Sequence, residues 1–138
     1  MSTENNKAIV RRFFAEYQQG NLDGAEEVLA ADFVHHQPGS TPQNREEYRQ
    51  LGSAFLKAFP DMQWIIEDQV SEGDKVATRL TISGTHRGEL LGIPPSGKQV
   101  NFTEIAIDRL VGGKIAERWN LVDTLGMMQQ LGVIPPMG

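Results

Sequence analysis

The chain has 138 residues, no cysteine and a formal net charge of −5, which excludes disulfides, thiolate catalysis and cysteine zinc sites. The negative net charge and the lack of a cluster of Lys and Arg argue against a nucleic-acid-binding surface. The chain also has no run of 18 apolar residues that could span a membrane. We expect one domain over residues 1–138. The N-terminus lacks the apolar core of a secretory signal, so we expect a cytoplasmic location.

The first third of the chain is predicted to be helical. Thr3 can cap a first helix, and apolar side chains then recur at the spacing of one helix face as far as Tyr17. Gly20 ends this helix, and Asn21 can cap a second, shorter one. The pattern therefore predicts two consecutive helices before any strand.

A short extended piece over residues 32–34 leads to the adjacent His35 and His36. The segment 37–42 is a loop by composition. A third helix with one apolar face follows and ends before Pro60, because proline cannot continue a helix.

After Pro60 the apolar period changes from that of a helix to that of a strand. Four strands are predicted, over residues 62–70, 75–86, 98–110 and 114–122. A last short helix follows. Helices followed by long antiparallel strands are typical of an α+β fold, in which a curved sheet packed against helices can enclose a conical pocket.

The predicted strands are apolar on both faces, although the helices are needed on one face only. A sheet that is apolar on both sides needs a second cover. We therefore expect a partner subunit over the outer face of the sheet.

A two-residue turn at Gly112-Gly113 sets the register of the last hairpin, because it pairs Val111 with Lys114. On this register one face carries Phe102, Glu104, Ala106, Trp119, Leu121 and Asp123, while Arg118 and Asn120 stand on the other. A β-bulge would change this assignment.

Two carboxylates, Glu104 and Asp123, thus share a face with a tryptophan and a phenylalanine. Desolvation in a pocket would raise the pKa of at least one of them, and a carboxyl tuned toward neutrality suits proton abstraction next to a carbonyl. The alternative is structural: Glu104 pairs with an arginine, and Asp123 caps the last helix.

The other charged candidates each have a structural alternative. Asp68 pairs with Arg79 across the first hairpin, either as a surface ion pair or with the arginine steering a substrate. His86 lies at the end of a strand, where it is either a structural residue with its hydrogen bonds satisfied or a catalytic residue. Adjacent histidines in a strand point opposite ways, so His35 and His36 cannot chelate one metal well, and we expect no metal site.

Five motifs occur in one order along the chain: FPD from Phe59, EGDKVATR from Glu72, GTHRGELLGIPPSG from Gly84, GGKIAERW from Gly112 and QQLG from Gln129. This series resembles the SnoaL-like polyketide cyclase family of the NTF2-like superfamily. The resemblance implies a cone of curved sheet over three helices, a deep apolar pocket, and a homodimer or tetramer. It also implies intramolecular aldol ring closure without metal or cofactor.

The resemblance implies that Asp123 is the general acid/base and that Tyr17, His36 and His86 are pocket positions. We count Asp123, Glu104 and His86 as candidate catalytic residues. The candidate substrate-binding residues are Tyr17, His36, Trp119, Phe14, Phe102 and Arg79. The family's cyclases carry a Gln-x-His pair where this chain has Glu104 and Ala106, so Glu104 either serves as a second acid/base group or holds Asp123 protonated.

The expected function is cofactor-independent acid/base catalysis on an apolar, carbonyl-bearing small molecule. An isomerase, hydrolase or hydroxylase of the same superfamily would use the same kind of pocket. A non-catalytic small-ligand-binding domain is the alternative from another class.

Overall fold

The computed structural model describes residues 2–135, and Met1 and residues 136–138 lie outside that range. The expected domain, 1–138, includes these four residues. The helices are α1 (Thr3–Gln18), α2 (Leu22–Glu27), α3 (Arg45–Ala58) and α4 (Thr124–Gln130). The strands are β1 (Leu29–His36), β2 (Gln43–Asn44), β3 (Gln63–Glu72), β4 (Lys75–Thr85), β5 (Gln99–Val111) and β6 (Lys114–Val122).

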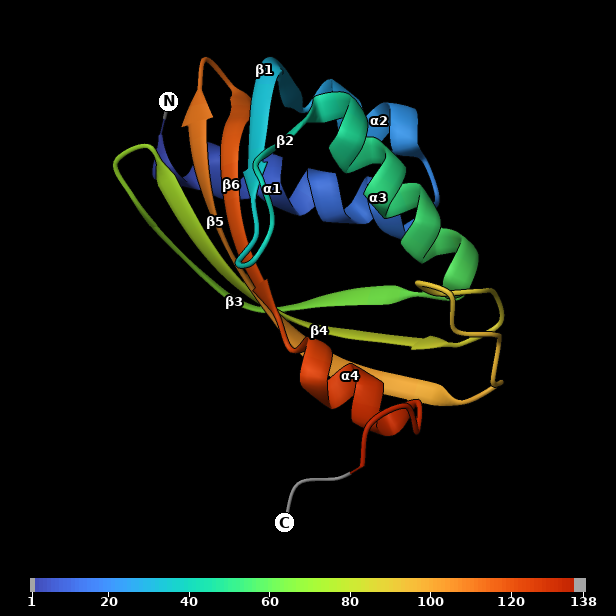
Figure 1. The fold of residues 1–138 in the computed structure, drawn as a ribbon. Coiled ribbons are helices and arrows are strands. Elements are labelled where there is room, and N and C mark those ends of the chain that lie inside the picture. The colour runs from blue at the N-terminus through green and yellow to red at the C-terminus, as the bar shows by residue number, and fades with distance from the viewer. Residues whose placement is uncertain (1, 136–138) are drawn as a thin grey trace.

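The six strands form one curved sheet in the order β2-β1-β6-β5-β4-β3, and α1, α2 and α3 lie on its concave side (Figure 1). α4 follows β6 at the opposite end of the sheet from the α1–α2 corner. The α+β prediction is confirmed. No helix within residues 2–135 is long and apolar enough to cross a membrane.

Two local expectations are corrected, and one short strand was not predicted. β1 pairs with β6 in parallel, so the sheet is mixed, not purely antiparallel. Residues 43–44, the two residues of β2, pair with β1. The cap of α1 is Ser2, whose side chain accepts a hydrogen bond from the Asn5 N–H, and Thr3 is already the first helical residue.

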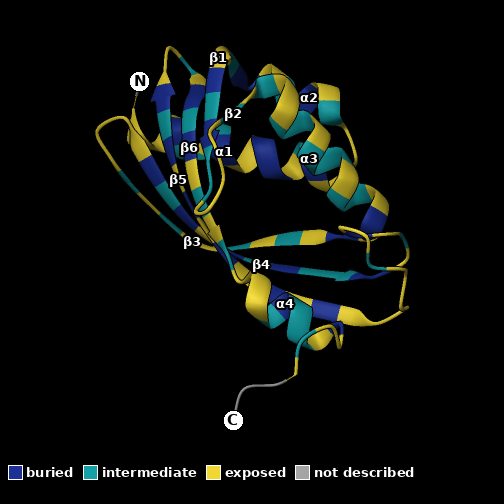
Figure 2. Cartoon of the chain, in the orientation of Figure 1, coloured by how far each residue is buried: buried dark blue, intermediate teal, exposed yellow. Residues whose placement is uncertain are grey.

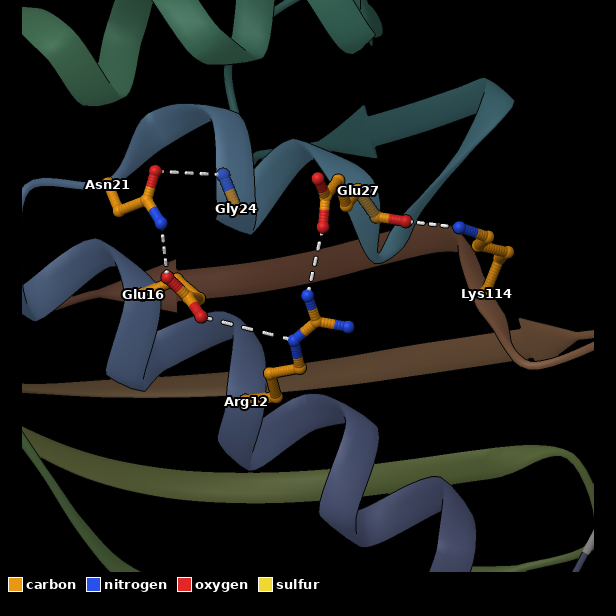
Figure 3. A network of polar contacts seen from close by, with 6 residues as sticks. All are labelled: Arg12, Glu16, Asn21, Gly24, Glu27 and Lys114. Carbon is orange, nitrogen blue, oxygen red and sulfur yellow. Dashed lines mark hydrogen bonds and ion pairs between the residues drawn. The ribbon is translucent and has the colours of Figure 1, made fainter.

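Polar contacts hold the corner between α1 and α2 (Figure 3). Asn21 caps α2 through the Gly24 N–H (3.1 Å) and also donates to Glu16 (2.7 Å). Arg12 forms an ion pair with Glu27 at 3.0 Å. The Lys114 ammonium donates to the Glu27 carbonyl, which ties the end of α2 to the β5–β6 turn. These contacts fix where α1 lies against the sheet.

Buried and exposed residues alternate strictly along most of β5 (Figure 2). The inward side chains meet two apolar clusters, one under α1 and α2, the other under the end of α3 and α4. The first includes Val10, Phe13, Leu80 and Ile115, and the second includes Phe59, Ile82, Phe102 and Met127. Between them the inward-facing row of the sheet is polar.

A β-bulge in β6 overturns the predicted register. Val111 pairs with Lys114 and Leu110 with Ile115, as the turn predicts, but Arg109 then pairs with Glu117 and Ala116 is left over. A slip of one residue exchanges the two faces of a strand. From Glu117 onward the predicted faces of β6 are therefore wrong.

The bulge turns Arg118 inward, directly opposite Asp108 on β5. Both side chains are fully buried, with Nε–Oδ1 at 2.5 Å and Nη2–Oδ2 at 3.0 Å. The guanidinium carbon lies 4.2 Å from the centre of the Phe13 ring, and Nη1 donates to the Tyr48 hydroxyl at 3.0 Å. This bidentate geometry satisfies charges that would otherwise be costly to bury.

Breaking this pair from one side should be costly. Asp108→Asn leaves the Arg118 charge buried without a counter-charge, so we expect a loss of about 3–5 kcal/mol in the free energy of unfolding, measured with urea. The matched control is Asp68→Asn at the exposed Arg79 pair (3.1 Å), where the loss should stay below about 1 kcal/mol. Equal losses at both positions would contradict this account of the core.

Candidate functional site

A pocket of about 100 Å³ lies between the inner face of the sheet and helices α1 and α3. Its lining is Tyr17, Gln37, Tyr48, Leu51, Gly52, Phe55, Met62, Trp64, Ile82, Phe102, Glu104, Asn120, Val122 and Thr124. The lining is mostly apolar and aromatic, with a few polar groups at defined places. That composition is typical of sites for small organic ligands.

Glu104 is the only ionisable carboxyl in this lining. Its side chain sits on β5, and the residue is 5% exposed. Burial raises the pKa of Glu104, and the nearby Asp108 acts in the same direction. The charge of Arg118 and a hydrogen bond from Asn120 oppose this shift. The result is a buried carboxyl with a raised pKa inside a mostly apolar pocket.

Two phenols face the same space. Burial raises the pKa of both Tyr17 and Tyr48, so both stay protonated near neutral pH and can donate hydrogen bonds. Tyr48 accepts from Arg118, which leaves its own O–H available. A Cβ on Gly52 would overlap the Tyr17 hydroxyl, so only glycine in α3 lets this phenol reach its place.

A line of hydrogen bonds leaves the pocket through Asn120. Its Oδ1 lies 2.7 Å from Nε2 of His35, a residue that is only 1% exposed. Nδ1 of the same ring lies 2.8 Å from Gln43 Oε1 on β2. The Tyr48 ring packs on the imidazole with centroids 4.4 Å apart. Burial lowers the pKa of His35, so the ring is neutral near neutral pH.

The structure places three of the predicted site residues in the pocket: Glu104, Tyr17 and Phe102. Phe14, expected to bind substrate, is buried in the core instead, where its ring lies 4.9 Å from the Arg118 guanidinium carbon. Phe14 therefore supports the buried ion pair.

Asp123 does not share a face with Glu104, because Glu104 pairs with Val122 after the bulge. Asp123 is exposed and caps α4, where its Oδ1 accepts from the Gly126 N–H at 3.0 Å. The neighbouring Thr124 reaches the pocket lining. The capping alternative thus describes the contact that Asp123 makes.

His86 is fully buried outside the pocket lining, beside Phe59 at 5.6 Å between ring centres. Its Nδ1 lies 3.0 Å from the Ser96 hydroxyl, and its backbone bonds to Lys98 and Gly97. These contacts hold the ends of the 86–97 loop together. The expected place of His86 at the pocket is therefore corrected.

His36, Trp119 and Arg79 lie on the outer face of the sheet, away from the pocket. His36 stacks on Trp119 at 5.3 Å and bonds to Glu117 at 2.6 Å. Arg79 pairs with Asp68 and is half exposed. Trp119 points outward because of the bulge, and His36 because its neighbour His35 points inward, so all three expectations of pocket contact are wrong.

The sequence reasoning missed Tyr48, Asn120 and His35. Two adjacent apolar residues, Ile115 and Ala116, are both buried in β6, which breaks strand alternation and is the local sign of the bulge. Moving the later part of β6 by one position would have brought Asn120 inward. Within residues 2–135, no group of three or more His, Asp or Glu side chains is arranged to hold a metal ion.

Comparisons with known proteins agree on one family. Residues 8–131 match the model of the SnoaL-like polyketide cyclase family. The chain is 31% identical to aklanonic acid methyl ester cyclase DnrD from Streptomyces peucetius, over 96% of this chain and 92% of the relative. It is 25% identical to the nogalonic acid methyl ester cyclase of Streptomyces nogalater, over 84% and 89%.

A solved structure gives the same result. AclR from Streptomyces galilaeus, a proposed hydroxylase, superposes with a TM-score of 0.92 at 29% identity, covering 99% of this chain and 87% of AclR.

The raised pKa of Glu104 predicts how stability depends on pH. A carboxyl with a raised folded-state pKa contributes stability that is complete below its unfolded pKa and is lost as the pH rises through the folded pKa. Glu104→Gln should therefore unfold with the same free energy as the parent near about pH 4 and be more stable near about pH 8. Urea unfolding across this range checks it, with exposed Glu72→Gln controlling for the loss of one negative charge. A Glu104→Gln variant less stable at the higher pH would contradict the assignment.

Proposed function

Because the chain belongs to the SnoaL-like polyketide cyclase family, we propose that it is a polyketide cyclase that closes a ring in an apolar, carbonyl-bearing substrate. The observation that carries this proposal is one buried carboxyl, Glu104, in an aromatic pocket that also presents two phenols. No metal or cofactor is needed for the reaction proposed.

In the proposed reaction the Glu104 carboxylate removes a proton from a carbon next to a substrate carbonyl. The resulting enolate carbon attacks a second carbonyl of the same molecule, and a carbon–carbon bond forms. The new alkoxide takes the proton back from Glu104. Atoms and charge balance, and the product is an isomer of the substrate. The raised pKa of Glu104 suits a group that must both take and return a proton.

The phenols supply stabilisation of the developing negative charge. Tyr17 and Tyr48 remain protonated and lie in the same lining as Glu104. Donors held in place inside a pocket stabilise an enolate oxygen more than water does, because they need no reorganisation. We therefore assign both phenols to the enolate oxygen.

The volume of about 100 Å³ is smaller than the 300–1,000 Å³ usual for whole drug-sized ligands. It accommodates the reacting part of a polyketide and leaves its remaining rings outside. Positions such as Phe55 and Trp64 then select for flat, apolar substrates. The family relatives named for methyl esters of aklanonic and nogalonic acid supply test substrates of this kind.

A hydroxylase is the second candidate, favoured by the high structural similarity to AclR. The two reactions differ in a directly measurable way. Cyclisation leaves the substrate mass unchanged, whereas hydroxylation adds one oxygen atom. Mass spectrometry of the product therefore separates the two candidates.

We also propose that the chain forms a homodimer, or a tetramer built from it, through the outer face of the sheet. Large apolar side chains there are between 37% and 60% exposed: Ile65, Ile105, Ile107, Trp119 and Leu121. Several charges among them are already paired, Arg79 with Asp68 and Glu117 with both His36 and Arg109, while Glu67 accepts a hydrogen bond from Thr81. Burying this face in a dimer would leave none of these paired charges without its partner. The cytoplasmic location expected from the sequence remains part of the proposal.

The acid/base assignment is tested by comparing two single substitutions. Glu104→Gln should lower the rate of ring closure of aklanonic acid methyl ester by about 10²–10⁴-fold, because proton transfer by a positioned group is worth that much. Asp123→Asn is the matched control, since it removes the carboxylate that the family resemblance favours while its Oδ1 can still cap α4. Product formation is followed by chromatography.

A Glu104→Gln variant that turns over normally while Asp123→Asn is inactive would transfer the role to Asp123. If both variants are active, neither carboxyl is the acid/base group.

The proposed dimer is tested by introducing a charged side chain on the outer face of the sheet. Ile105→Glu should shift the sedimentation mass from dimer to monomer, since a carboxylate at the centre of an apolar interface is costly to bury. The control is Leu91→Glu, at an apolar position in the 86–97 loop that is 74% exposed, against 47% for Ile105. A parent protein that sediments as a monomer at every concentration would rule the interface out.

A further inference from the structure

A line of polar side chains from Glu104 crosses four adjacent strands, with the Asn120 amide next to the carboxyl and short contacts from it to His35 and on to Gln43. Glu104 on β5 and Asn120 on β6 are diagonal neighbours on the inner face, since Asn120 pairs with Ala106. His35 lies on β1, the next strand, and Gln43 pairs with it on β2. The line thus runs from the pocket carboxyl to the edge of the sheet.

The chemistry of the line gives it a direction. Both ring nitrogens of His35 face an amide oxygen, Nε2 that of Asn120 at 2.7 Å and Nδ1 that of Gln43 at 2.8 Å, and a neutral imidazole has one N–H to donate. With the proton on Nε2, the contact to Asn120 is the hydrogen bond. The Asn120 amide then turns its N–H₂ group toward Glu104. Gln43 is only partly buried, so its amide can turn to donate to the unprotonated Nδ1.

We infer that His35 is a positioning residue for Glu104: its Nε2–H fixes the Asn120 amide so that an N–H, and not the amide oxygen, meets the carboxyl. An N–H donor favours the carboxylate, which is the form that removes a proton, whereas an amide oxygen would favour the neutral acid. This inference rests on the proposed function in one respect: it takes Glu104 as the group that transfers the proton.

The fixed surroundings of Glu104 are the same with either orientation of the amide. The charged or titratable groups around it are Asp108 on β5, Arg118 on β6, His35 on β1, Tyr17 on α1 and Tyr48 on α3. His35 touches these surroundings at two places, the Asn120 amide and the Tyr48 ring that packs on the imidazole. Two variants that both lose the imidazole ring but differ in their bond to Asn120 therefore isolate the link through Asn120.

Two substitutions separate the nitrogen atoms of the ring. His35→Gln places an amide N–H near the position of Nε2 and keeps the bond to Asn120. His35→Asn reaches only the position of Nδ1 and loses that bond. A role in folding alone predicts no advantage of one amide over the other in the titration of Glu104.

The primary measurement is the titration of the Glu104 carboxyl carbon by ¹³C NMR in the ligand-free protein, with the signal assigned by its loss in Glu104→Gln. His35→Asn should move the midpoint to higher pH, and His35→Gln should restore it. With aklanonic acid methyl ester as substrate, kcat/KM on the acid side of the pH profile should fall about 10- to 100-fold in His35→Asn and recover in His35→Gln.

An unchanged Glu104 midpoint in His35→Asn would overturn the inference, as would equal shifts in both variants. If His35→Asn fails to fold, Gln43→Met removes the group that selects the tautomer and should shift the midpoint in the same direction by less. No shift there overturns the inference too. Failure of the proposed function is distinct, because it appears as normal turnover in Glu104→Gln whatever the NMR titration shows.

Discussion

The bulge at Ala116 decides which side chains of β6 face the interior, and the rest of the site depends on that choice. Without it, the tight turn at Gly112-Gly113 would point Trp119 and Leu121 inward and leave Asn120 on the outside. With it, two consecutive apolar residues, Ile115 and Ala116, are buried, and the register then shifts by one. One unpaired residue thus exchanges an apolar inner face for a polar one.

A polar row inside an apolar shell is stable only if its members satisfy one another. Asp108 and Arg118 neutralise each other, and Arg118 also bonds to Tyr48. His35 is bonded at both ring nitrogens. Glu104 differs, because Arg118 and Asn120 favour its charge but burial outweighs them. The network that stabilises the row therefore leaves one carboxyl with a raised pKa, and that carboxyl faces the pocket.

The sequence was sufficient for those features that depend on local spacing. Turns and apolar periods predicted the helices and the four long strands, and the pairing across the first hairpin predicted the Asp68–Arg79 pair. The site was harder to predict from the sequence, because whether a side chain points into or out of the sheet depends on every residue between it and the turn. The sequence could also indicate that His35 and His36 point opposite ways, but the choice between them depends on the parallel pairing of β1 with β6, a contact between distant segments.

Glu104 and Ala106 stand where the resemblance implies a Gln-x-His pair, and this replacement also depends on which side chains face inward. Ala106 stands directly opposite Asn120, and its small side chain leaves the Asn120 amide free to lie diagonally toward Glu104. In the site we propose, a histidine is still coupled to the carboxyl, but it comes from β1 and acts through an amide. The proposed arrangement separates two tasks: the imidazole sets an orientation while remaining neutral, and the carboxyl alone exchanges the proton. A site organised in this way needs only one group whose charge changes during the reaction, which suits a closed, apolar pocket where each additional charge would be costly.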